Sequence, residues 1–170
     1  LDSAELGHPP EKFARVFAAA LKQGYLTVAH AGEEGPSSNI IDALDILHVS
    51  RIDHGVRCVD DPQLVARLIK EKTHLTVCPL SNTKLKVFAS MTQHNIVDLL
   101  RLGVSVGINA DDPAYFGGYM NDNFNAVAAA HTLSHEQLAQ FTANAIDASF
   151  CSLQRKHELH QQLQTYMDNQ

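Results

Sequence analysis

The sequence predicts an α/β fold in which parallel strands alternate with helices. Short β-rich runs alternate with amphipathic helical stretches along the 170 residues, a pattern typical of parallel strands joined by right-handed crossovers. The first strand leads into His30-Ala-Gly-Glu33 and not into a GxGxxG loop, which disfavours a dinucleotide-binding fold. An eight-stranded βα barrel of the TIM type, (β/α)8, needs about 250 residues. Four predicted strands therefore indicate about the last four βα units of such a barrel, followed by C-terminal helices.

Each element follows from its hydrophobic pattern. Residues 10–22 predict an amphipathic helix that Gly24 ends. Pro62 suits the first turn of a later helix, and Gly103 suits the residue after another. Strands are predicted at residues 26–30, 50–54, 74–78 and 104–108, and further helices at 39–47, from 61–62 through 69, 95–102, 123–131, 135–150 and 152–167. We expect residues 1–170 to form a single domain. Because the chain begins with Leu1 and not Met, we expect the first half of the barrel to lie upstream.

Composition limits the classes of partner. The formal net charge is −6 and no stretch is strongly basic, which argues against a nucleic-acid polymer or an anionic membrane surface. No apolar run approaches the roughly 20 residues that span a bilayer. Cys58, Cys78 and Cys151 are too few and too widely spaced for a disulfide framework or a metal knuckle. This cysteine usage predicts a reducing, cytoplasmic location.

Polar residues gather where each predicted strand ends. The four strands lead into His30-Ala-Gly-Glu33, Asp53-His54-Gly55, Ser81-Asn82 and Asn109-Ala-Asp111-Asp112-Pro113. In a parallel barrel these ends face one mouth, where active sites are built. A single histidine is more often structural, and Asp-Asp-Pro is also an ordinary helix start, but four such sites in register favour an active site.

These side chains suit hydrolytic chemistry at a metal ion. His30 and Asp111 offer the nitrogen and oxygen ligands that zinc accepts. Glu33 could act as a general acid or base, and His54 could take a proton from water or orient it. Asp112 could hold a substrate donor. His48, His74 and His94 are expected at helix ends or strand starts, away from this rim, in solvated or capping roles.

The four motifs together resemble those of the adenosine/adenine deaminase family. They are His30-Ala-Gly-Glu33, Arg51-Ile-Asp-His54-Gly55, Cys78-Pro-Leu-Ser-Asn82 and Asp111-Asp112-Pro113, and the resemblance covers residues 1 to about 153. It implies a (β/α)8 barrel and a zinc-dependent hydrolytic removal of the purine 6-amino group, in purine salvage.

The resemblance also implies a role for each site residue. His30 and Asp111 would be zinc ligands, Glu33 would protonate the purine ring, His54 would assist the attacking water, and Asp112 would bind the imidazole part of the purine. The family's first strand carries a His-x-His pair that supplies two more ligands, and this sequence has none. We therefore expect one Zn²⁺ per full-length protein, with two ligands upstream, and no activity from these 170 residues alone.

Three questions stay open at this point. The segment Tyr115-Phe-Gly-Gly-Tyr119 resembles the adenine branch, although adenosine is an alternative substrate and these aromatic residues could be mere loop packing. A two-metal hydrolase with a bridging lysine is a second possibility, disfavoured because Lys70, Lys72, Lys84 and Lys86 are expected on a helix or loop and not at a strand end. A third is a non-catalytic half-barrel that self-associates, because open sheet edges favour a homodimer.

Overall fold

The fold is a four-stranded parallel sheet with helices following the strands. The structure is a computed structural model that describes residues 1–2 and 4–169. The sheet has the order β1-β2-β3-β4, so neighbours in sequence are neighbours in space. Its strands are β1 (Val28–Ala31), β2 (Arg51–His54), β3 (Leu75–Val77) and β4 (Val106–Ile108). The predicted α/β fold of parallel strands is confirmed.

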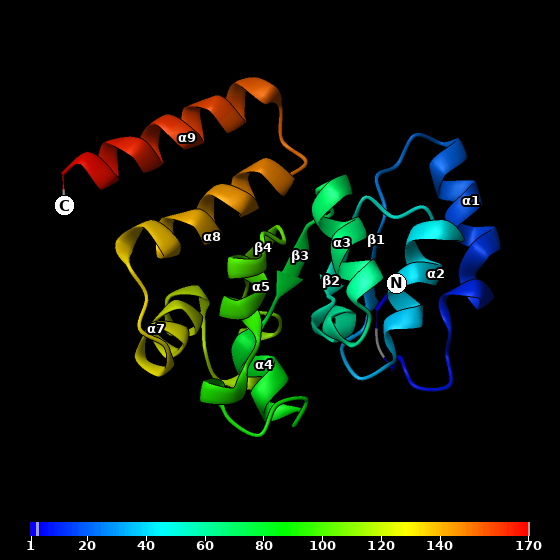
Figure 1. Ribbon diagram of the computed structural model, residues 1–170. Coiled ribbons are helices and arrows are strands. Elements are labelled where there is room, and N and C mark those ends of the chain that lie inside the picture. Colours follow the sequence, from blue (N-terminus) through cyan, green and yellow to red (C-terminus); the bar gives the residue numbers. More distant parts are fainter. Residues whose placement is uncertain (3, 170) are drawn as a thin grey trace.

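The helices connect the strands, and the C-terminal ones then lie on the β4 side of the sheet (Figure 1). The longer ones are α1 (Ala14–Lys22), α2 (Ser37–Asp45), α3 (Pro62–Glu71), α5 (Ile96–Leu102), α7 (Met120–Ala130), α8 (His135–Ala148) and α9 (Leu153–Asp168). The shorter ones are α4 (Pro79–Lys84), α6 (Pro113–Phe116) and the 3₁₀ turns η1 (Pro10–Phe13), η2 (Val56–Asp60) and η3 (Met91–Gln93). α8 packs on β4 and on α9. In the described part of the chain, every helix is too short or too polar to cross a bilayer.

Local sequence explains where the helices begin and end. The Asp61 side chain accepts hydrogen bonds from the backbone N–H groups of Gln63 and Leu64, and Pro62 occupies the first turn of α3. Gly103 follows α5 with a φ of 91°, a left-handed conformation that glycine adopts without strain. The predicted helix starts and stops at these positions are correct.

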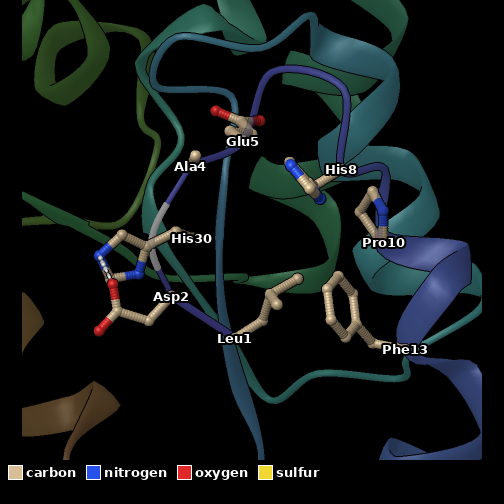
Figure 2. Close-up of a pocket in the computed structure, with 8 residues that line it drawn as sticks. All are labelled: Leu1, Asp2, Ala4, Glu5, His8, Pro10, Phe13 and His30. Carbon is tan, nitrogen blue, oxygen red and sulfur yellow. Dashed lines mark ion pairs between the residues drawn. The ribbon is translucent and has the colours of Figure 1, made fainter.

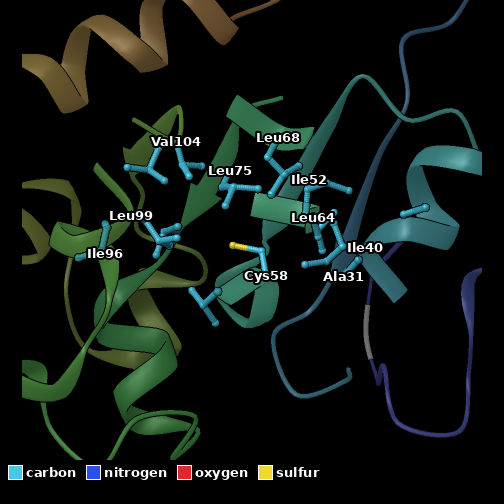
Figure 3. Close-up of a cluster of buried hydrophobic side chains, with 14 of the residues drawn as sticks. Ala31, Ile40, Ile52, Cys58, Leu64, Leu68, Leu75, Ile96, Leu99 and Val104 are labelled. Atoms are coloured by element: carbon cyan, nitrogen blue, oxygen red, sulfur yellow. The ribbon is translucent and has the colours of Figure 1, made fainter. Parts of the chain in front are cut away.

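The two faces of the sheet differ in character. Apolar side chains such as Ile52 and Leu75 lie on the face that the connecting helices cover, where they form the core with residues of α3 and α5 (Figure 3). On the other face, His30, Asp53 and Thr76 lie side by side in the strand register. The sheet therefore carries a polar row across three strands beside its apolar core.

The structure adds one element. The sequence predicts a third strand at residues 74–78 that leads into Ser81-Asn82, and it predicts no helix there, but β3 ends at Val77 and Pro79–Lys84 forms the helix α4. Pro79 cannot donate to a strand ladder and is suited to the first turn of a helix. Asn82 therefore reaches the site from a helix.

Candidate active site

The candidate site lies at the C-terminal ends of the four strands. His30 belongs to β1 and Glu33 follows that strand, His54 ends β2, and Asn82 lies on α4 after β3. Asp111 follows β4. The parallel arrangement brings these ends to one edge of the sheet, as the sequence predicts.

Glu33, His54 and Asn82 form one hydrogen-bonded group. Asn82 Nδ2 donates to Glu33 Oε1 at 2.6 Å and lies 3.2 Å from His54 Nδ1. Glu33 Oε1 is itself 3.2 Å from His54 Nδ1. The two predicted catalytic residues are therefore neighbours, and a buried asparagine joins them.

The Glu33 carboxyl has an unusual proton affinity. Burial raises its pKa to about 7, although the charge of His30 and the hydrogen bond from Asn82 act in the opposite direction. The nearby carboxylate of Asp111 adds to the increase. A carboxyl group that titrates near neutral pH can both give and take a proton, which is the property a general acid–base catalyst needs.

His54 is held in its neutral form and faces Asp111. Burial and the charge of His30 lower the pKa of His54 to about 4. Its Nε2 atom lies 3.9 Å from Asp111 Oδ2. His54 and Asp111 have φ values of 63° and 58°, in the left-handed region that only a few per cent of non-glycine residues adopt. Backbone strain of this kind clusters at functional sites.

His30 pairs with the polar row of the sheet. Its Nδ1 atom lies 3.5 Å from Asp53 Oδ2, and Thr76 Oγ1 donates to Asp53 Oδ1 at 2.5 Å. Burial alone lowers the pKa of His30, but the interactions with Asp53 and with nearby carboxylates outweigh it and raise that pKa. A carboxylate on Nδ1 leaves Nε2 as the nitrogen available to a metal, the usual arrangement for metal-binding histidines.

Glu5 holds the loop that carries Glu33. Its two carboxylate oxygens accept hydrogen bonds from the backbone N–H groups of Gly32, Glu33, Glu34 and Gly35, at 2.6 to 3.1 Å. The Asn39 amide donates to the same carboxylate at 2.9 Å. Figure 2 shows Glu5 above His30, whose Nε2 lies 3.7 Å from Asp2 Oδ1. The N-terminal segment therefore fixes the loop after β1.

The donor set fits a divalent cation such as zinc. Among the described residues, ligand atoms of His54, Cys78 and Asp111 lie within 4.8 Å of one another. His30 is not in this group, but its ring is 4.6 Å from that of His54 between centroids. Burial and the charge of Asp111 raise the pKa of the Cys78 thiol, so it is a poor ligand. His30 and Asp111 offer the better nitrogen and oxygen donors, and a cation would offset the repulsion among the carboxylates.

Asp112 is the one predicted site residue that the structure does not join to the others. It precedes α6, and its exposed side chain does not cap that helix. Within the described residues it forms no ion pair with the histidines of the site. Its substrate-binding role stays a prediction.

The sequence predicts no part in the site for four residues that shape it: Glu5, Asp53, Asn82 and His94. Asp53 and Asn82 belong to the motifs at the ends of the second and third predicted strands, and that position is a signal in the sequence. Nothing local marks Glu5, because its partners lie 27 to 34 residues away. The expectation that His94 lies away from the rim is wrong, because His94 is buried against Asn82. His74 is buried as well, whereas His48 is exposed as expected.

Comparisons with known proteins agree with this geometry. The family model described as adenosine deaminase matches residues 1–166. The adenine deaminase of Vibrio parahaemolyticus serotype O3:K6 is 62% identical over 167 residues, which are 98% of this chain and 50% of that protein. The adenine deaminase of Hahella chejuensis is 58% identical over 169 residues, with 99% and 51% covered. The chain spans about half the length of the curated relatives it matches.

Solved structures show the same likeness. The crystal structure of an adenine deaminase from Arthrobacter aurescens superposes with a TM-score of 0.97 at 46% identity, over 99% of this chain and 51% of that one. An amidohydrolase from Burkholderia ambifaria, determined with bound Zn, gives 0.88 at 28% identity, over 99% and 48%. The sheet and helices of this chain thus correspond to about half of a (β/α)8 barrel.

Proposed function

Because the chain belongs to the adenosine deaminase family, we propose that the full-length protein converts adenine and water into hypoxanthine and ammonia. The convergence of Glu33, His54 and Asp111 at one edge of the sheet is the observation that carries this proposal. The similarity to proteins named adenine deaminase supports adenine as the substrate.

In this proposal His30 and Asp111 hold a zinc ion, and two histidines outside these 170 residues complete its ligands. A bound zinc ion would supply a Lewis acid and lower the pKa of water toward 7. Two ligands are fewer than the three that catalytic zinc sites usually have. We therefore propose that these 170 residues alone are inactive.

Glu33 acts as the proton donor in the proposed reaction. Its protonated carboxyl gives a proton to the purine ring nitrogen beside C6, which makes C6 more electrophilic. A water molecule then adds to C6, one of its protons passes to the departing amino group and the other returns to Glu33, and the C6–N bond breaks to release ammonia. The pKa of about 7 keeps a substantial share of Glu33 protonated at neutral pH.

His54 orients the attacking water. Its pKa of about 4 keeps the ring neutral. Nδ1 lies 3.2 Å from both the Asn82 amide nitrogen and Glu33 Oε1. In this proposal Nδ1 accepts from the Asn82 amide, which leaves the proton of the neutral ring on Nε2. Nε2 faces Asp111, the residue proposed to hold the metal. His54 can therefore donate a hydrogen bond to an oxygen that lies between the two groups.

Asp112 is proposed to bind the imidazole part of the purine. Replacing it with asparagine removes a charge but keeps the size of the side chain. The Asp112→Asn variant should raise KM for adenine roughly tenfold, the effect of losing about 1.4 kcal/mol of binding. A steady-state assay in which KM is unchanged would contradict this role.

Turnover of the two purines tests the function. We expect the full-length protein to release ammonia from adenine faster than from adenosine, with about one zinc ion per chain by elemental analysis. Preference for adenosine would reassign the substrate, two metal ions per chain would favour a two-metal hydrolase, and no ammonia from either purine would overturn the proposal. We further propose a cytoplasmic location and a role in purine salvage.

A further inference from the structure

A chain of hydrogen bonds enters the site from the start of α5. The backbone N–H of Ile96 donates to His94 Nδ1 at 3.1 Å, and His94 Nε2 lies 3.2 Å from Asn82 Oδ1. The amide nitrogen of Asn82 then contacts Glu33 and His54. His94 is 1% exposed and Asn82 is fully buried, so water does not compete for these contacts.

The donor and the acceptor of each hydrogen bond in this series follow from the first bond, between Ile96 and His94. A backbone N–H can only donate, so His94 Nδ1 must accept and carries no proton. The proton of the neutral ring is then on Nε2, which donates to Asn82 Oδ1. With the oxygen of its amide facing His94, Asn82 directs its NH₂ group to Glu33 Oε1 and His54 Nδ1.

The surroundings of His94 fix the position of its ring and keep it neutral. The ring of Phe88 packs on it with a centroid separation of 4.2 Å. Burial and the charge of His131 lower the pKa of His94 to about 3, so the ring stays neutral at any pH where the protein would work. The backbone carbonyl of Asn82 also accepts from Val87 and Phe88, which fixes the helix end that carries it.

We infer that His94 is a positioning residue for the proposed deamination: it orients the Asn82 amide so that this amide holds the Glu33 carboxyl and sets the proton of His54 on Nε2. The inference rests on the proposed function of Glu33 and His54. A reversed Asn82 amide would present an oxygen to Glu33 Oε1, which is unfavourable when Glu33 is ionised. His54 Nδ1 would then also lose the amide donor that Asn82 offers it.

Two amide substitutions, each of which reproduces one of the two ring-nitrogen positions of His94, separate this role from a structural one. In His94→Gln the amide nitrogen replaces Nε2, so the donor to Asn82 is kept and the acceptor for Ile96 is lost. In His94→Asn the amide oxygen replaces Nδ1, so the acceptor is kept and the donor is lost. A structural role in capping α5 makes Gln the more damaging change, whereas positioning makes Asn the more damaging one.

The test measures adenine turnover by the full-length protein and both variants. We expect His94→Asn to lower kcat at least tenfold with KM within about twofold, because Glu33 and His54 act in the transition state. His94→Gln should stay within about threefold of the unmodified kcat. His74→Asn is the control, a buried histidine at the opposite end of the sheet whose Nδ1 meets Ser105 Oγ at 2.9 Å. Equal losses in the two His94 variants, or an unchanged His94→Asn, would overturn the inference.

Imidazole ¹⁵N NMR of the unmodified protein gives a second readout that does not depend on activity. We expect His94 to show the Nε2–H tautomer from pH 6 to 8, and a spectrum of the Nδ1–H tautomer would overturn the inference even if the variants failed to fold. Absence of ammonia release by the unmodified protein would instead contradict the proposed function. The two failures are therefore distinguishable.

Discussion

At the scale of single residues, Glu5 has the most concentrated set of contacts near the site. It is 9% exposed, and five N–H donors surround its carboxylate. Hydrogen bonds to a charged group contribute about 1.5–3 kcal/mol each, and a buried carboxylate that lost them would be strongly unfavourable. The loop that presents Glu33 therefore depends on a side chain nearly thirty residues earlier.

Replacing Glu5 with glutamine should damage both stability and activity. The amide NH₂ would face backbone N–H donors, so we expect Glu5→Gln to lower the free energy of unfolding by about 3 kcal/mol, the cost typical of breaking a buried charged network. Chemical denaturation measures this change. The exposed Glu34→Gln is the matched control and should change stability by less than about 0.5 kcal/mol. Equal stabilities of the two variants would contradict the role given to Glu5.

At the scale of elements, two buried histidines besides His54 make the sheet and its helices sensitive to acid. His74 precedes β3 and His94 precedes α5. Burial lowers the pKa of His74 to about 4 and that of His94 to about 3, against about 6.5 for a free histidine. Because the folded state binds protons less readily than the unfolded chain, their contribution is complete above pH 6.5 and is lost as pH falls toward 4 and 3.

We therefore expect the protein to lose several kcal/mol of stability between pH 7 and pH 4. When the pKa of a group differs by one between the folded and unfolded states, the difference corresponds to about 1.4 kcal/mol, so one such histidine accounts for up to about 3 kcal/mol. Urea titrations at each pH measure the slope. His74→Gln cannot ionise and should flatten it, and an unchanged slope in that variant would contradict this origin of the acid sensitivity.

The elements themselves were largely predictable, and their contacts were not. Apolar periodicity and the cap residues Asp61 and Gly103 fixed the order of strands and helices. The sequence predicts Glu33 and His54 at the ends of consecutive strands. These ends lie side by side because the strands are parallel. The short helix at Asn82 and the buried position of His94 depend on side-chain packing across different elements, which local pattern does not encode.

At the scale of the whole molecule, the two outer strands of the sheet, β1 and β4, are partly covered along their open edges. The Leu1 amino group donates to Val28 O and Leu1 O accepts from His30 N, both at 3.0 Å, as a neighbouring strand would. On β4, Val106 O accepts from the Asn144 amide of α8 at 3.0 Å. Open sheet edges are surfaces with which a second sheet can pair.

We expect the isolated 170 residues to self-associate through these edges and the polar face between them. Analytical ultracentrifugation at micromolar concentration should show a dimer or larger species. A monomer that stays stable under these conditions would contradict this expectation, and it would show that Leu1 and α8 cover the edges sufficiently.

The central claim is that Glu33 supplies a proton within a site shared with His54 and Asp111. The most direct measurement compares adenine turnover by the full-length protein with that of Glu33→Gln, which keeps the shape of the side chain but cannot transfer a proton. General acid–base catalysis contributes about 10²–10⁴-fold, so we predict a loss of kcat of at least 100-fold with an unchanged thermal unfolding temperature. A Glu33→Gln variant that retained more than a tenth of the unmodified kcat would contradict the account.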